Sequence, residues 1–126
     1  MKKILVIDDE EAIRFFLEKE LSEAGYSVLT AENGKYGVQK AQEQKPDLIL
    51  LDIKMPEMDG VETVDLLRGD SRTKNTPIIF VTGLVEKDEV EDGFIKGSKG
   101  VDQYFIAKPL NMDEVLQFVH KTIGKP

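Results

Sequence analysis

The chain of 126 residues contains no cysteine. Disulfide bonds, thiolate metal sites and cysteine nucleophiles are therefore excluded. An excess of basic residues is also absent, since the formal net charge is −7 at pH 7. Surfaces that bind nucleic acid phosphates are basic, so we expect no direct contact with nucleic acid. No apolar run is long enough to cross a bilayer, and the first run begins too early for a signal peptide. We therefore expect a cytoplasmic protein without membrane contact.

The composition that remains is typical of a globular protein. Hydrophobic residues make up 40% of the chain and charged residues 33%, a balance that does not match a disordered segment. A chain of this length can bury a useful core. We therefore expect a single domain over residues 1–126.

Apolar, strand-like runs alternate with helical patterns along the whole chain. Strands are predicted at Lys3–Asp8, Tyr26–Ala31, Asp47–Asp52, Pro77–Thr82 and Gln103–Ala107. Helices are predicted from Ile13 to Ala24, at Lys35–Gln44 and Val61–Arg68, and from Met112 to Ile123. If the less clear segment 83–101 is counted as the helical part of its unit, there are five units of strand followed by helix. Their connections suit right-handed crossovers, so they predict a three-layer α/β/α sandwich.

The helix patterns also predict which residues face inward. In Val61–Arg68 these are Val64, Leu67 and Val61. The last helix has Asn111 as its predicted N-cap, paired with Glu114, and Gly124 as its stop. Residues 83–101 are the least clear segment, because Val90, Phe94 and Ile95 hint at a helix that Gly93 and Gly97 weaken.

Four of the five strand-like runs end in a polar residue that can take part in chemistry. The first leads into Asp8, Asp9 and Glu10, the third into Asp52, the fourth into Thr82 and the fifth into Lys108. Ligands of open parallel sheets bind beyond the carboxyl ends of the strands, so these side chains converge at one edge. Carboxylates, a hydroxyl and an ammonium together suit a divalent cation and a phosphoryl group.

The acidic residues predict a magnesium site. Asp8, Asp9 and Asp52 lie together if the first and third strands are neighbours, and like charges then repel. Mg²⁺ relieves this repulsion and takes oxygen ligands. A single Asp after a strand is usually a solvated loop residue, but a pair facing a third Asp favours the metal site. A carboxylate such as Asp52 can also act as a nucleophile and form an aspartyl-phosphate.

The other two groups would support that product. Lys108 would supply a positive charge and Thr82 a hydroxyl donor. Taken alone, Thr82 is better explained as a residue with good strand propensity. Lys108 lies at the end of a predicted buried strand and before Pro109, so a solvated surface lysine is a poorer explanation.

Four motifs now resemble those of a CheY-like response-regulator receiver domain. They are the stretch Ile4–Glu10, the stretch Pro46–Gly60, the step Val81-Thr82-Gly83 and the pair Lys108-Pro109. They occur in the family's order and cover essentially the whole chain. The resemblance implies a flavodoxin-like fold with a five-stranded parallel sheet in the order 2-1-3-4-5, which puts the first and third strands side by side.

The resemblance also implies roles for individual residues. Asp52 would accept phosphate from a histidine kinase or a phosphotransfer protein. Asp9 and Asp52 would bind Mg²⁺ directly, together with the backbone carbonyl of Lys54, while Asp8 would act through water. Thr82 and Lys108 would read the phosphoryl group. The protein would be a signalling switch that assists its own phosphorylation and autodephosphorylation, rather than an enzyme.

Further implications concern how the signal leaves the site. The family controls a downstream partner or output domain through the segment after the fourth strand, the fifth strand and the last helix. In this chain residues 83–101 are longer than is usual, so we expect this segment to be mobile and partner-specific. The switch aromatic matches Phe105, with Tyr104 beside it, and the Lys108–Pro109 bond would be cis. An exposed Phe15 and Phe16 would help to dock a kinase.

Two alternatives from other classes are less favoured. A Mg²⁺-dependent phosphatase of the haloacid-dehalogenase type has a second Asp two residues after its nucleophile, where this chain has Lys54. A flavodoxin-like flavin-binding protein needs a loop rich in Ser, Thr and Gly after the first strand. Here that loop reads Asp8-Asp9-Glu10-Glu11, which would repel a phosphate that lacks a cation.

Overall fold

The computed structural model describes residues 1–53, 60–82, 90–91, 94–95 and 104–126. Strands and helices alternate through most of these residues. Their bounds are β1 (Lys3–Ile7), α1 (Glu11–Glu23), β2 (Ser27–Ala31), α2 (Gly34–Gln44), β3 (Leu48–Leu51), α3 (Gly60–Arg68), β4 (Ile78–Thr82), β5 (Val90–Glu91), β6 (Phe94–Ile95), β7 (Tyr104–Ala107) and α4 (Met112–Ile123). Each of the five predicted strands is present, with each bound shifted by one residue at most.

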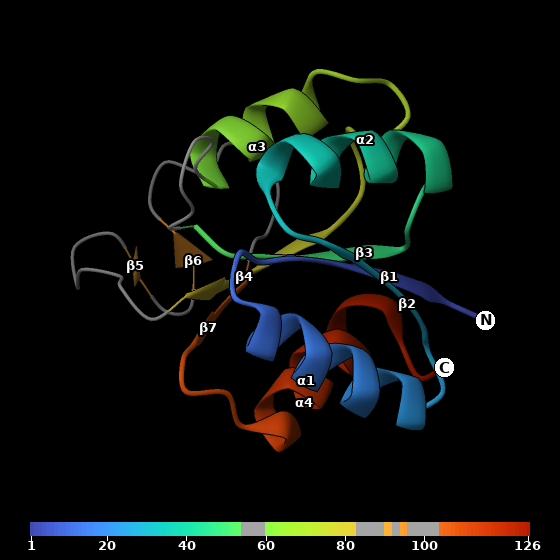
Figure 1. The fold of residues 1–126 in the computed structure, drawn as a ribbon, viewed down its shortest axis with the longest axis vertical. Coiled ribbons are helices and arrows are strands. Elements are labelled where there is room, and N and C mark those ends of the chain that lie inside the picture. Colours follow the sequence, from blue (N-terminus) through green and yellow to red (C-terminus); the bar gives the residue numbers. More distant parts are fainter. Residues whose placement is uncertain (54–59, 83–89, 92–93, 96–103) are drawn as a thin grey trace.

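The sheet has the predicted order at its centre and one addition at its edge. The strand order is β2-β1-β3-β4-β7-β6-β5, and the first five of these strands are parallel (Figure 1). Strands β1 and β3 are therefore neighbours, with Ile7 opposite Leu51. The predicted α/β/α fold with the order 2-1-3-4-5 is confirmed.

The helix suggested by Val90, Phe94 and Ile95 is wrong for the residues that are described. Val90–Glu91 and Phe94–Ile95 instead pair as short antiparallel strands, and Phe94 pairs with Tyr104 of β7. Glycine weakens a helix by about 1 kcal/mol relative to alanine, whereas Val, Ile and Phe suit a strand. The rest of residues 83–101 lies outside the described residues, so its expected mobility and partner specificity stay predictions.

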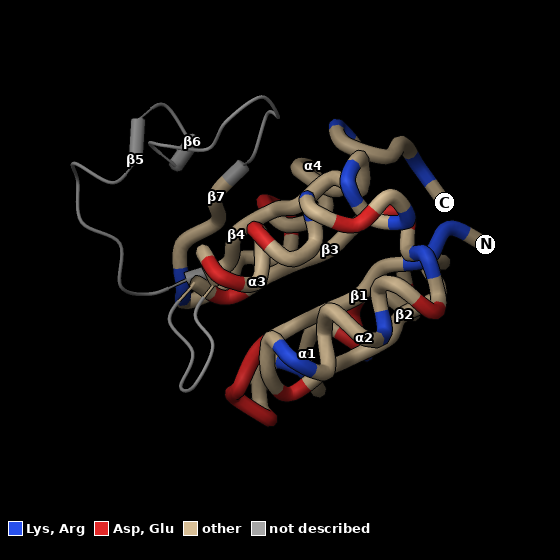
Figure 2. The backbone as a smooth tube through the Cα atoms, turned by 90° about the horizontal axis from the view of Figure 1, so that it is seen from above, with Lys and Arg blue, Asp and Glu red and all other residues tan. Residues whose placement is uncertain are grey.

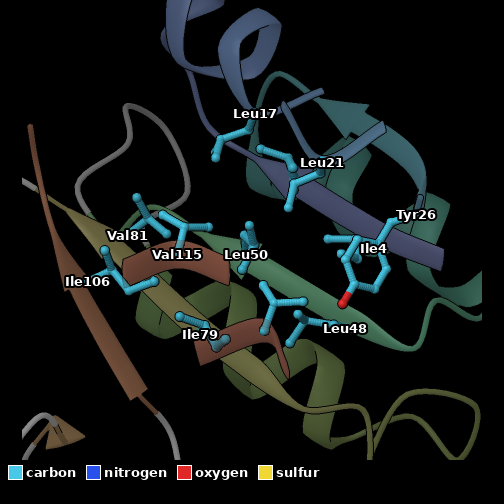
Figure 3. Close-up of a cluster of buried hydrophobic side chains, with 12 residues drawn as sticks. Ile4, Leu17, Leu21, Tyr26, Leu48, Leu50, Ile79, Val81, Ile106 and Val115 are labelled. Carbon is cyan, nitrogen blue, oxygen red and sulfur yellow. The ribbon is translucent and has the colours of Figure 1, made fainter. Parts of the chain in front are cut away.

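Helices cover both faces of the sheet. Helices α1 and α4 lie on one face and α2 and α3 on the other (Figure 1). Alternate residues of each strand supply the two cores, so Ile4 and Val6 face α1 and α4 while Leu5 and Ile7 face the other pair. Figure 3 shows the first core, in which Leu17 and Leu21 pack over the strands together with Val115. Burial of each such side chain contributes about 1.5–3 kcal/mol.

Two helices begin with an asparagine cap, and one of these caps was predicted. The Asn111 side chain accepts a hydrogen bond from the Glu114 amide at 3.2 Å, so this predicted N-cap is confirmed. Asn33 caps α2 in the same way at 2.9 Å, a contact the sequence analysis did not predict. A cap of this kind stabilises a helix by about 1 kcal/mol. Gly25 follows Ala24, the C-cap residue of α1, and has a φ of 105°, where only glycine is unstrained.

The prediction that Val61 of α3 faces inward is wrong. Val61 has 59% of its surface exposed, whereas Gly60, Thr63 and Leu67 form the buried side of the helix. The close approach at Gly60 explains this orientation, because a Cβ there would lie 2.6 Å from the Cα of Ile53. That approach directs the side of α3 that carries Gly60 toward the sheet and leaves Val61 in solvent.

The two ends of the chain are tied together at one end of the molecule. The Lys2 ammonium donates to the carbonyls of Ile123 at 2.6 Å and Lys125 at 2.8 Å, and the Tyr26 hydroxyl donates to Gly124 at 2.9 Å. Figure 2 shows acidic positions gathered where α1 begins, away from both ends of the chain. None of the helices in the described part of the chain is long and apolar enough to span a membrane.

Candidate functional site

The ends of β1 and β3 place two buried carboxylates side by side. Asp8 follows the last residue of β1 and is 1% exposed, while Asp52 follows the last residue of β3 and is 4% exposed. The Asp52 amide donates to the Ile7 carbonyl at 3.0 Å, and the Asp8 amide donates to the Ala31 carbonyl at 3.1 Å. The sheet ladder thus continues into the site and fixes where both side chains begin.

Lys108 brings a positive charge from a third strand. It follows the last residue of β7, and the Lys108–Pro109 peptide bond is cis, as predicted. The Lys108 Nζ lies 3.0 Å from Asp8 Oδ2, 3.2 Å from Glu10 Oε1 and 3.4 Å from Asp52 Oδ2. The lysine therefore contacts Asp52 as the sequence analysis expected, and it contacts Asp8 more closely.

Four carboxylates meet at this end of the sheet. One oxygen from each of Asp8, Asp9, Glu10 and Asp52 can be chosen so that all four lie within 4.8 Å of one another. Asp9 and Glu10 are exposed, so the cluster runs from buried oxygens out to solvent. Oxygen ligands around a shared centre are what Mg²⁺ takes in proteins. The fourth predicted ligand, the carbonyl of Lys54, lies outside the described residues.

The electrostatics of the buried groups reflect both burial and pairing. Burial raises the pKa of Asp8 above its usual 3.8, although the Glu10 amide and Lys108 favour the ionised form. Burial acts to lower the pKa of Lys108, but its hydrogen bond to Asp8 and the charges of Asp8 and Asp52 outweigh this effect, so the pKa is raised. Lys108 therefore stays charged and offsets part of the negative charge of the cluster.

The remaining predicted residues are placed only in part. Thr82 is the last residue of β4 and pairs with Ala107, next to Lys108, but its side chain lies outside the described set. Phe105 is half-buried in β7, and Tyr104 precedes it with a side chain that is likewise not described. Their switch roles stay predictions.

The sequence analysis missed the role of Glu10 in pairing with Lys108. It noted Glu10 at the end of the first strand but gave it no partner. The Arg14 guanidinium also donates to the Asp8 carbonyl at 2.7 Å and so braces the same turn. The spacing of Glu10 and Arg14, four residues apart, favours a pair between these two residues, so it gave no signal for either contact.

A comparison with known protein families agrees with this geometry. Residues 4–120 match the family model of the response regulator receiver domain. The chain belongs to that family. The resemblance seen in the sequence motifs is thereby confirmed, and neither the phosphatase nor the flavin-binding alternative is favoured.

Curated relatives of this receiver domain include both long and short proteins. The alkaline phosphatase synthesis transcriptional regulatory protein PhoP of Bacillus subtilis is 41% identical over 114 residues, which cover 90% of this chain but only 45% of PhoP. The chemotaxis protein CheY of the same species is 34% identical over 124 residues, covering 97% of this chain and 98% of CheY. The chain thus spans about half of PhoP but nearly all of CheY.

Solved structures show the same fold. CheY4 of Vibrio cholerae has a TM-score of 0.85 at 33% identity, covering 97% of this chain and 98% of CheY4. TrrA of Thermotoga maritima, solved in complex with Mg²⁺–BeF, has a TM-score of 0.80 at 37% identity, covering 97% and 99%. A receiver domain of a sensor histidine kinase from Pseudomonas aeruginosa, solved with magnesium in its active site cleft, reaches 0.84 at 26% identity, covering 98% of each chain.

Proposed function

We propose that Asp52 is the phosphoryl acceptor of this receiver domain. The observation that carries this proposal is the placement of the Asp52 carboxylate, which is buried at the end of β3 and lies 3.4 Å from the Lys108 ammonium. Asp8 is also buried, and its Oδ1 accepts from the Glu10 amide at 2.9 Å while its Oδ2 pairs with Lys108 at 3.0 Å. The receiver family carries its acceptor at the end of the third strand, where this chain has Asp52.

In the reaction, an oxygen of Asp52 forms a bond to the phosphorus of the donor. With a phosphohistidine donor, the P–N bond breaks and its electron pair stays on the imidazole nitrogen, which then takes up a proton. The product is an acyl phosphate on Asp52. Lys108 pairs with the phosphoryl oxygens as negative charge builds up on them, and its position at the end of β7 is set before the donor arrives.

The residues present suit a magnesium ion. Asp9 and Asp52 would hold it directly and Asp8 through water, with the Lys54 carbonyl as a further ligand from outside the described residues. When bound, Mg²⁺ offsets negative charge on the carboxylates and on the phosphoryl oxygens. Support comes from the clustering of the four carboxylates within 4.8 Å and from the two relatives solved with magnesium.

The proposed partners are a histidine kinase or phosphotransfer protein as donor and a downstream protein or output domain as receiver of the signal. Phe15 is 74% exposed and Phe16 is 37% exposed, both in the second turn of α1, whose N-cap residue Glu10 belongs to the acidic cluster. Their exposure supports the predicted docking of the donor beside the site. The expected location of this exchange is the cytoplasm.

The test is intact mass spectrometry after incubation with Mg²⁺ and acetyl phosphate. We expect one added phosphoryl group on the wild-type protein and none on Asp52→Ala. Asp65→Ala is the matched control, because Asp65 is an exposed carboxylate on α3 outside the cluster. Labelling of Asp52→Ala at the wild-type level would disprove the assignment.

A further inference from the structure

The Glu10 side chain is directed toward the site rather than toward the helix that it begins. Glu10 is the N-cap residue of α1, yet its side chain makes no capping hydrogen bond. Arg14 lies four residues later on α1, a spacing that favours a Glu–Arg ion pair, but its guanidinium donates to the Asp8 carbonyl instead. Among the described residues, Glu10 pairs with Lys108, at 3.2 Å.

The hydrogen-bonding capacity of Lys108 makes this contact important. A lysine ammonium has three N–H donors and no acceptor. In the structure Lys108 faces three carboxylate oxygens, from Asp8, Glu10 and Asp52, which can take all three donors. A phosphoryl group on Asp52 adds further oxygens that need a donor, so one of the present partners must give way.

The three partners differ in what release costs them. Asp8 is buried, so losing Lys108 would leave its carboxylate without a counter-charge inside the protein. Asp52 itself carries the phosphoryl group, so its contact with Lys108 passes to the phosphoryl oxygens. The Glu10 side chain is 56% exposed and can return to water at little cost. Glu10 is therefore the partner that gives way most easily.

We propose that Glu10 is a positioning residue that holds Lys108 in the unphosphorylated protein and competes with the phosphoryl group for it. This inference rests on the proposed function of Asp52. Glu10 keeps the ammonium in place over the cluster until the phosphoryl group displaces it. The contact lowers the affinity of the site for a phosphoryl group, because Lys108 must first release Glu10.

The measurement is binding of beryllofluoride in saturating Mg²⁺, followed by NMR, together with the rate of phosphorylation by acetyl phosphate. Glu10→Gln should bind beryllofluoride about two- to fivefold more tightly and react faster by a similar factor, the range expected for an exposed ion pair. The matched control is Glu11→Gln, which removes the same charge from the next residue. Glu11 is exposed in the first turn of α1 and has no recorded ion pair with Lys108.

A conservative variant tests whether the effect of Glu10 comes from its contact with Lys108 or only from its negative charge. Glu10→Asp keeps the negative charge but shortens the side chain by one methylene, so it should lose most of the 3.2 Å contact and behave like Glu10→Gln. The ¹⁵N resonance of the Lys108 ammonium, measured without ligand, should shift in both Glu10 variants and stay in place in Glu11→Gln. A merely structural role of Glu10 would move the melting temperature and leave this resonance unchanged.

The outcomes distinguish this inference from the proposed function. If the wild-type protein neither binds beryllofluoride nor gains a phosphoryl group, the function of Asp52 fails and the role of Glu10 fails with it. If the wild-type protein does both and Glu10→Gln matches Glu11→Gln, only the role of Glu10 is wrong. Wild-type affinity in Glu10→Asp would also overturn it, since charge alone would then account for the effect.

Discussion

Replacement of Asp9 by Asn should stabilise the metal-free protein and weaken its response to Mg²⁺. One Asp9 oxygen lies within 4.8 Å of an oxygen from each of the other three carboxylates. Two unit charges at that distance repel by about 1 kcal/mol at the dielectric constant of water. Asp9 is exposed, so the dielectric constant of water applies to its repulsion, rather than the smaller constant of a protein interior. We expect Asp9→Asn to gain about 1 kcal/mol in EDTA, or about 3–6 °C in melting temperature.

Magnesium should reverse this order. A ligand at ten times its Kd stabilises the native state by about 1.4 kcal/mol, provided that it binds only the folded protein. The wild-type protein should gain this amount of stability. Asp9→Asn should gain much less, because it lacks the negative charge of one of the carboxylates that would bind the metal. The two melting curves should therefore exchange places between EDTA and excess Mg²⁺.

The assay is thermal unfolding followed by circular dichroism, with and without Mg²⁺, in low salt. Glu11→Asn is the control, because Glu11 is an exposed neighbour that is not part of the four-carboxylate cluster. If Asp9→Asn melts below the wild-type protein in EDTA, or if both gain equally from Mg²⁺, charge repulsion is not what the metal relieves.

Three further predictions test the scaffold and its charges. Gly37→Ala should destabilise the protein by about 1–3 kcal/mol in urea unfolding, although alanine favours helix, because its Cβ would lie 2.7 Å from the Cγ1 of buried Ile7. Lys108→Met should cost about 3 kcal/mol in EDTA, since it leaves two buried carboxylates without their counter-charge, and Mg²⁺ should restore part of this loss in the same assay. Hydrogen bonds from the Arg72 side chain and amide hold the pKa of Asp70 at about 2, below its usual 3.8. The stability that this pair contributes is complete above pH 3.8 and lost as the pH falls through about 2, so an acid titration of Asp70→Asn should lack this loss.

The sequence was sufficient to predict the buried part of the site. Strands covered by helices on both faces are continuously apolar, so the residue at which polarity returns marks the end of the strand. Asp8, Asp52 and Lys108 are such residues, and the parallel order of the strands brings them to one edge. The meeting of these three residues at one edge could therefore be predicted without knowing any distance.

Features set by packing or by surface contacts were harder to predict. The inward pattern of α3 placed Val61 in the core because valine is apolar, but the close approach of Gly60 to Ile53 decides the orientation. The sequence showed Glu10 only as one of the polar residues after the first strand, and the three-dimensional position of Lys108 is needed to show what it binds. The strands β5 and β6 are two residues each, too short for a periodic pattern to reveal them.

The contrast between Asp52 and Glu10 explains how one site can be both rigid and able to switch. The Asp52 amide is bonded to Ile7 at 3.0 Å, so its carboxylate begins one position beyond a ladder of buried strands. The backbone of Asp52 cannot shift without disturbing the core. This suits a side chain that would hold a metal and a phosphoryl group in fixed geometry. Glu10 lies three residues beyond the end of β1 and is exposed, so its side chain can leave Lys108 without any cost in packing. In the proposed function, the fixed groups would define the reaction, and the Glu10 contact would determine how readily Lys108 turns to the phosphoryl group.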